Sequence, residues 1–188
     1  MPIELKDFES HIEHKKGKGE ADQEVSAISA FKLDEADGIG VALGFTNNSL
    51  SKADYLHILD NNFTIVEASD LRDQLKDCVA AIEVEEAKAL EELQVTKPHV
   101  KKLPKKVSKP IEDKCYYNLK AELMQKWGGS IAISERLCRV KGIGHHPNYS
   151  YMIVCRNGTD VQVLNRFKQK MEGAIKNIKV LTTETIAF

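Results

Sequence analysis

Apolar positions in the first quarter of the chain predict two helices and a short strand. Residues 2–15 have a loose helical spacing, and lysines and glycines directly after them interrupt it. Residues 20–33 carry apolar side chains at intervals of three, which predicts a helix with one apolar stripe. Asp37-Gly38 marks a turn, and the apolar run 39–45 predicts a strand. The apolar residues behind the two helix predictions are Ile3, Phe8, Ile12, Val25, Ile28 and Phe31.

The next segment predicts a β-hairpin followed by a long helix. Residues 53–59 and 63–68 are rich in apolar and β-branched side chains, which is typical of strands. The Asp-Asn-Asn run at 60–62 is a tight-turn signal between them. A helix is predicted to follow over residues 70–93.

The second half of the chain predicts two helices and then a strand–helix–strand unit. The two helices cover 111–127 and 130–140, because Gly128-Gly129 interrupts the pattern between them. Thr159 or Asp160 is expected to cap the helix of the last unit. That unit consists of a buried strand at 151–155, a helix over 161–174 and a strand over 178–182, which make a right-handed parallel crossover.

These elements predict an α/β protein with a mixed sheet of about five strands flanked by helices. The 188 residues suit a single domain over 1–188, and 42% hydrophobic residues is ordinary for a globular protein. The chain has 27 basic and 28 acidic residues, so its net charge is −1. Any surface for nucleic acid must therefore come from local segregation of charge.

Charge is segregated in one place, a lysine- and proline-rich segment in the middle of the chain. Residues 97–109 hold six lysines, two prolines and no acid, and proline opposes a regular helix. We predict a loop or extended arm over 97–110. Residues 68–92 hold eight acids against three basic residues, so the two segments could neutralise each other. Alternatively the arm binds phosphates of nucleic acid through Lys101, Lys102, Lys105 and Lys106.

The cysteines and the hydropathy of the chain indicate the cellular compartment in which we expect the protein. The four cysteines are too far apart for a CxxC-type metal pair and lie among apolar residues, which predicts reduced, mostly buried thiols. The N-terminus has no apolar signal region. No segment approaches the roughly 20 apolar residues that span a bilayer. We expect a cytoplasmic protein that does not enter the membrane.

Two acids in the predicted hairpin are the strongest candidates for chemistry. Asp54 opens the first strand, and Glu67 lies near the end of the second strand, two residues before Ser69. This layout resembles the PD-(D/E)XK nuclease-like superfamily, in which an acid opens the first hairpin strand and an E-x-K motif ends the second. The resemblance covers roughly residues 20–92, and the strand–helix–strand unit is compatible with the rest of a restriction-endonuclease-like sheet.

The resemblance implies metal-dependent hydrolysis of phosphodiester bonds in DNA or RNA. Asp54 and Glu67 would hold Mg²⁺ or Mn²⁺, and Glu24, or alternatively Glu20, would assist from the element before the hairpin. The lysine of the motif, which helps to hold the attacking water, is replaced by Ser69. The candidates for the missing positive charge are Lys76 first, and then Arg72 or Lys52.

Three other interpretations stay open. Asp54 and Glu67 can be ordinary acids at strand ends with no shared role. The chain can be a non-catalytic member of the same fold that binds nucleic acid or a protein partner, for example in a phage or defence system. It can also be an unrelated α/β interaction protein. Carboxylates that face a cleft would favour a nuclease, and carboxylates paired to basic side chains would favour the others.

Overall fold

The computed structural model describes residues 3–14, 23–46, 49–144 and 146–188. The chain divides into two compact units, which are described separately. The first, the sheet unit, comprises the chain up to Asp70 together with Leu123–Phe188. The second, the helical unit, is Leu71–Glu122.

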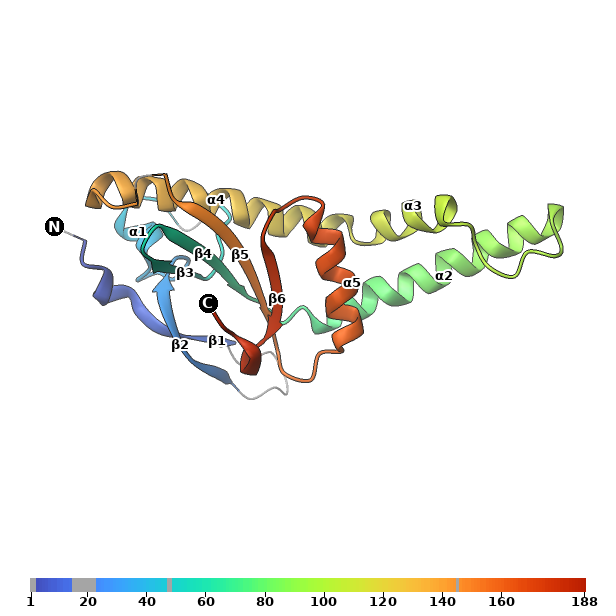
Figure 1. Ribbon diagram of the computed structural model, residues 1–188, viewed down its shortest axis with the longest axis horizontal. Coiled ribbons are helices and arrows are strands. Elements are labelled where there is room, and N and C mark those ends of the chain that lie inside the picture. Colours follow the sequence, from blue (N-terminus) through green and yellow to red (C-terminus); the bar gives the residue numbers. More distant parts are fainter. Residues whose placement is uncertain (1–2, 15–22, 47–48, 145) are drawn as a thin grey trace. The chain divides into compact units, whose positions relative to one another are not determined.

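The sheet unit is built on a mixed sheet whose strands follow one another in sequence order. Over the described residues it has six strands, in the order β1-β2-β3-β4-β5-β6 (Figure 1). β1 to β4 pair antiparallel, whereas β4, β5 and β6 pair parallel. The strands are β1 (Glu9–His14), β2 (Glu24–Lys32), β3 (Tyr55–Leu59), β4 (Asn62–Ala68), β5 (Asn148–Cys155) and β6 (Ile178–Thr182).

Five α-helices and two short 3₁₀ turns complete the described chain. α5 connects β5 to β6, and Asp160 caps it by accepting a hydrogen bond from the backbone N–H of Gln162 at 2.7 Å. This confirms one of the two predicted caps. The helices are α1 (Ile39–Ala42), α2 (Arg72–Thr96), α3 (Lys105–Cys115), α4 (Tyr117–Lys141) and α5 (Val161–Glu172), and the 3₁₀ turns are η1 (Leu5–Phe8) and η2 (Thr183–Thr185).

The two faces of the sheet bury different sets of side chains. Successive residues of a strand point to opposite faces, so Tyr151 and Met152 belong to different layers. Tyr151 contacts Trp127 of α4, with ring centroids 5.3 Å apart. Met152 belongs to a buried cluster that includes residues from five strands and the C-terminal segment. The members of that cluster are Ile12, Ala30, Tyr55, Val66, Met152, Val154 and Ile186.

A close backbone approach fixes α4 against the segment before β3. Ser130 accepts a hydrogen bond from the backbone N–H of Ala53 at 2.8 Å. A Cβ atom at Gly129 would lie 1.9 Å from the carbonyl oxygen of Ser51, so only glycine fits there. The prediction that a helix ends at Gly128-Gly129 is therefore wrong. The tertiary contact at Gly129 outweighs the roughly 1 kcal/mol by which each glycine disfavours a helix.

The predictions for the first quarter of the chain are also wrong. The described part of the first predicted helix, residues 3–14, contains a 3₁₀ turn and β1. The described part of the helix predicted over 20–33, from residue 23 onwards, contains β2. The spacing of three was misleading because Val25 is 52% exposed and does not join the core. The strand predicted over 39–45 contains the short helix α1.

The predictions for the hairpin, for the helix after it and for the last strand–helix–strand unit are confirmed. β3 and β4 form the predicted hairpin, and α2 follows it. β5, α5 and β6 form the predicted crossover with parallel pairing of the two strands. The described residues form six strands instead of about five. β1 and β2 lie where helices were predicted, and the strand predicted over 39–45 contains α1.

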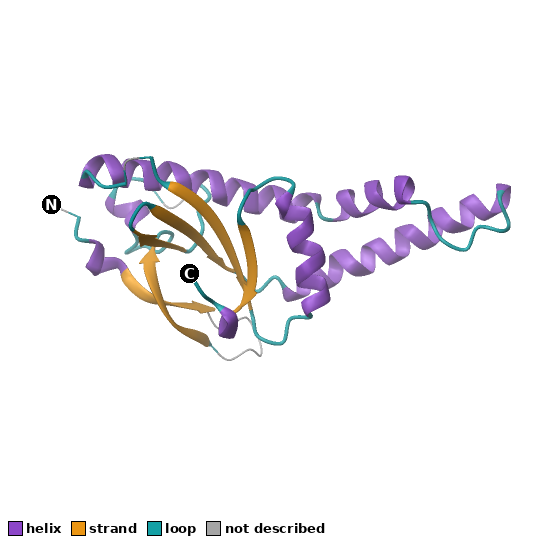
Figure 2. Cartoon of the chain, in the orientation of Figure 1, coloured by secondary structure: helices purple, strands orange, loops and turns teal. Residues whose placement is uncertain are grey.

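The helical unit consists of α2, α3 and the start of α4, and Figure 2 shows helices and loops but no strand in it. α2 and α3 are neighbours, and Cys78 on α2 donates a hydrogen bond to the carbonyl of Cys115 on α3 at 3.4 Å. α3 begins directly after Pro104, which is its N-cap. The lysine-rich segment is thus helical from Lys105 onwards. The expected loop over 97–110 is correct only in its first half, since a proline before the first turn leaves the helix intact.

Among the described residues, no helix combines the length and the apolar character needed to cross a membrane.

Candidate functional site

The strand register brings the two predicted acids together. β3 pairs with β4 so that Leu56 faces Ile65 and Tyr55 faces Val66. One residue further along, the same register sets Asp54 opposite Glu67. Directly opposite residues of an antiparallel pair have Cβ atoms about 4.5–5.5 Å apart. The two carboxylates are therefore neighbours on one face of the sheet.

Glu67 is completely buried and is held by a lysine from α4. Its Oε1 atom lies 2.6 Å from Nζ of Lys126. The hydroxyl of Ser69 donates a hydrogen bond to the same oxygen. The Glu67 side chain is 1% exposed and the Lys126 side chain 23%, so the pair is largely shielded from water.

Asp54 is half-buried beside this pair. Its Oδ2 atom accepts a hydrogen bond from the backbone N–H of Ala68 at 2.8 Å. Burial, and then the negative charge of Glu67, raise the pKa of Asp54 to about 7. The Ala68 N–H and the charge of Lys126 act in the opposite direction and are weaker. The charge of Lys126 therefore offsets only part of the effect of burial and of Glu67 on Asp54.

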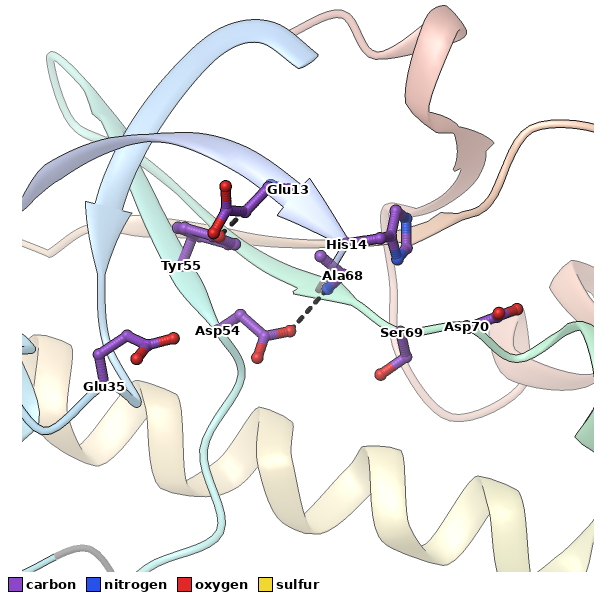
Figure 3. Close-up of a pocket in the computed structure, with 8 residues that line it drawn as sticks. All are labelled: Glu13, His14, Glu35, Asp54, Tyr55, Ala68, Ser69 and Asp70. Atoms are coloured by element: carbon purple, nitrogen blue, oxygen red, sulfur yellow. Dashed lines mark hydrogen bonds between the residues drawn. The ribbon is translucent and has the colours of Figure 1, made fainter. Parts of the chain in front are cut away.

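Asp54 also borders a hollow at the end of the sheet. The hollow has a volume of about 260 Å³ and is rich in oxygen atoms (Figure 3). Figure 3 shows Asp54 and Ser69 on its wall, with Glu35 to one side and the end of β1 on another. The lining residues are Glu13, His14, Glu35, Asp54, Tyr55, Ala68, Ser69 and Asp70.

The other predicted basic residues form ion pairs of their own. Lys76, on α2 in the helical unit, has a side chain that is 68% exposed and lies 3.9 Å from Asp73. Lys52 is buried but forms an ion pair with Asp34 at 2.7 Å. Arg72, the remaining candidate, lies 4.0 Å from Asp73. Glu20 lies outside the described residues.

Glu24, predicted to assist at the metal, has a different set of partners. Its Oε2 accepts hydrogen bonds from the backbone N–H of Asn157 at 3.0 Å and from the hydroxyl of Thr183 at 2.9 Å. Its Oε1 lies 3.9 Å from the guanidinium of Arg156. These contacts tie the start of β2 to the ends of β5 and β6. We therefore restrict the candidate metal ligands to Asp54 and Glu67.

Lys126 was missed in the sequence, although a signal for it was present. The buried positions of α4 recur every three or four residues, and Lys126 falls on this stripe between Leu123 and Ser130. A charged residue on a buried stripe needs a partner of opposite charge. The stripe was obscured because the helix was predicted to end at Gly128-Gly129. The buried residues on it are Leu119, Leu123, Ser130, Ile133 and Leu137.

The predicted phosphate-binding lysines divide into two pairs. Lys101 and Lys102 line a hollow of about 490 Å³ in the helical unit, together with Glu83 and Glu86 of α2. This shared hollow favours local neutralisation by acids, one of the two alternatives, for this pair. Lys105 and Lys106 are exposed on the first turn of α3, where the positive end of the helix dipole opposes a cation.

Two searches bear on the identity of the site. Within the described parts of the chain, no three His, Cys, Asp or Glu side chains are arranged to hold a metal ion. In comparisons with known proteins, no family model matches the chain, and no curated protein or solved structure is significantly similar to it.

Proposed function

We propose that the protein is a metal-dependent nuclease-like phosphodiesterase that acts on DNA or RNA. The observation that carries the proposal is the position of Asp54 opposite Glu67, with Nζ of Lys126 2.6 Å from Glu67. An acid before the first hairpin strand and an acid near the end of the second are the elements of the resemblance. The hairpin and the parallel crossover beside it support a restriction-endonuclease-like core.

The donor set at Asp54 and Glu67 suits a hard divalent cation. Carboxylate oxygens are the ligands that Mg²⁺ and Mn²⁺ prefer, and one or two carboxylates are usual for Mg²⁺ in phosphoryl-transfer sites. Two adjacent carboxylates with a single lysine leave room for a further positive charge. Such an ion, when bound, would polarise a phosphoryl oxygen and lower the pKa of water. Asp54, which also borders the hollow, and Glu67 would hold it.

Lys126 supplies the positive charge that Ser69 does not. In the resembled family this charge comes from the residue two positions after the glutamate, where this chain has a serine. Here it comes from α4, which the Ser130–Ala53 hydrogen bond fixes against the start of β3. A fixed cation near a reacting phosphate stabilises the charge that develops in the transition state, and removing one such group costs about 10²–10³ in rate.

Cleavage assays with charge-neutral substitutions test the proposal. Glu67→Gln and Lys126→Met should each abolish or strongly reduce cleavage of single- and double-stranded DNA and RNA in the presence of Mg²⁺ or Mn²⁺. Lys76→Met is the matched control, because its ion pair with Asp73 is exposed. Cleavage that persists undiminished in both Glu67→Gln and Lys126→Met would reject the proposed site.

A non-catalytic binding protein on the same fold is the second candidate. The Glu67–Lys126 pair favours it, because a buried carboxylate satisfied by a lysine is also a common structural feature. In that case neither metal nor cleavage is involved. A double variant, Glu67→Leu with Lys126→Met, would fold and bind nucleic acid or a protein partner as the wild type does. A wild type that binds no divalent ion and cuts no substrate decides for this candidate.

A further inference from the structure

A buried histidine with an available lone pair borders the hollow described above. His14, the last residue of β1, is 2% exposed. Its ring makes a hydrogen bond with the backbone of Cys155, and Nε2 has no hydrogen-bond partner among the described residues. The Cys155 bond must therefore involve Nδ1, and an N–H donated to a carbonyl fixes the tautomer. Nε2 is left as an acceptor.

An irregularity in the sheet places His14 at this position. The pairing of β1 with β2 shifts register between His11 and Glu13, and His14 then lies opposite Glu24. Bulges and register shifts of this kind re-aim side chains and are common next to active sites. Figure 3 shows His14 at the end of β1, across the hollow from Asp54.

The charged groups around His14 keep its ring neutral at pH 7. Burial, and then the positive charge of Arg156, lower the pKa of His14. Glu24 and Asp70 act in the opposite direction, but both carboxylates interact with the Arg156 guanidinium, at 3.9 Å and 2.9 Å. Arg156 thus offsets the acids that would otherwise favour a charged ring.

We propose that His14 is a catalytic residue of the hydrolysis proposed above, with Nε2 as the acceptor of the proton from the attacking water. The inference rests on that proposed function. A water molecule in the hollow gives a proton to Nε2, and its oxygen forms a bond to phosphorus. The bond between phosphorus and the leaving sugar oxygen breaks, and that oxygen takes up a proton from solvent. His14 returns its proton to solvent, so the net reaction consumes one water and yields a phosphomonoester and an alcohol.

The hollow provides what such a step requires. A general base must reach the proton it accepts directly or through one water. Asp54, one of the two candidate metal ligands, lines the same 260 Å³ space as His14. Apart from Ala68, the other lining residues, which include Glu13 and Glu35, carry carboxylates or hydroxyls. Among these residues His14 has the side chain whose ordinary pKa is closest to neutrality.

Three variants of the full chain test the role of His14. His14→Asn retains an N–H donor near the position of Nδ1 but has no Nε2, so it should fold and should cleave about 10²-fold more slowly, within the range for general bases. His14→Ala vacates space for added imidazole, which should restore much of the lost rate. His57→Asn is the control, because His57 lies on β3 and is not among the residues that line the hollow. Its ring stacks on Phe188, with ring centroids 3.7 Å apart. It should retain wild-type activity.

Two further measurements separate this role from a structural one. Imidazole should not rescue Glu67→Gln, which lacks a candidate metal ligand. Nitrogen NMR of the metal-free protein should show the His14 tautomer with the proton on Nδ1. If wild type cleaves but His14→Asn keeps its rate, or the proton lies on Nε2, the role of His14 is rejected and the proposed function stands. If wild type cleaves no substrate with any divalent ion, the proposed function and the role of His14 both fall.

Discussion

Nζ of Lys126 lies 2.6 Å from Oε1 of Glu67, although 59 residues separate the two in the sequence. The contact joins the middle of α4 to the end of β4. Glu67 is fully buried, so its charge depends on this lysine and on the hydroxyl of Ser69. The same pair is the core of the proposed site, and its removal therefore affects stability as well as chemistry.

Lys126→Met should lower the free energy of unfolding by about 2–4 kcal/mol, because it leaves Glu67 buried with a smaller set of partners. Adding Glu67→Leu should recover most of this loss, since an apolar pair of similar volume can replace a buried ion pair. Urea unfolding of the wild type, of Lys126→Met, of Glu67→Leu and of the double variant measures both effects. Lys76→Met, which removes an exposed pair, should change stability by less than about 0.5 kcal/mol. Equal losses in Lys126→Met and Lys76→Met would contradict this account.

The two adjacent glycines of α4 should respond in opposite ways to alanine. Gly129→Ala should lower the melting temperature, because its Cβ would lie 1.9 Å from the Ser51 carbonyl oxygen. Gly128→Ala should raise stability by about 0.5–1 kcal/mol, because no atom lies within 4 Å of its added Cβ and alanine favours a helix. Thermal unfolding of both variants checks the difference. A stabilising Gly129→Ala would mean that α4 does not approach Ser51 so closely.

Asp54→Asn should make metal-free protein less sensitive to pH. The pKa of Asp54 is 3.8 in its unperturbed form and about 7 in the folded chain, so the folded state binds the extra proton between these values. Wild-type stability should therefore fall as pH rises from about 4 to about 7. The variant lacks this loss and should exceed wild type by up to about 4 kcal/mol at pH 8, but by little at pH 4. Urea unfolding at several pH values, with a chelator present, measures the stability difference between the variant and the wild type. A difference that does not grow with pH would show that Asp54 is charged throughout.

Local patterns predicted the elements of this fold that are stabilised by their own sequence. The hairpin at 53–68 carries a turn signal between two β-rich runs, and the helix over 161–174 carries a capping aspartate. Both formed where expected. The resemblance implied that Asp54 and Glu67 would lie near each other, and the observed register agrees with this.

Elements determined by distant contacts could not be predicted in the same way. β2 is a strand because it pairs with β1 and β3, although its apolar residues recur every three positions. α4 continues through Gly128-Gly129 because the glycine backbone fits against Ser51. Lys126 lies on that continuation, so an error about one helix end concealed a residue of the candidate site.

The two lysine pairs of the 97–110 segment should differ in any binding to nucleic acid. Lys105→Gln with Lys106→Gln should flatten the salt dependence of affinity by up to about 0.9 per lost phosphate contact on duplex DNA. Lys101→Gln with Lys102→Gln should have a smaller effect, because Glu83 and Glu86 line the same hollow as these lysines. Titrations at several salt concentrations compare the double variants. Unchanged slopes in both would show that this segment does not contact phosphate.

Metal binding tests the candidate ligands independently of any substrate. Calorimetry with Mn²⁺ should show binding to the wild type at millimolar concentration or below. Asp54 and Glu67 present adjacent carboxylates, and the positive charge of Lys126 offsets their negative charge only in part. Glu67→Ala should weaken binding at least tenfold, since it removes one of two protein ligands. Glu24→Ala is the matched control, because Glu24 instead contacts Asn157, Thr183 and Arg156, and it should bind as the wild type does. Binding should also weaken as pH falls below about 7, because protonated Asp54 is a poor ligand. Equal affinity of the wild type and Glu67→Ala would place the ion elsewhere and remove the basis for a metal-dependent reaction at this pair.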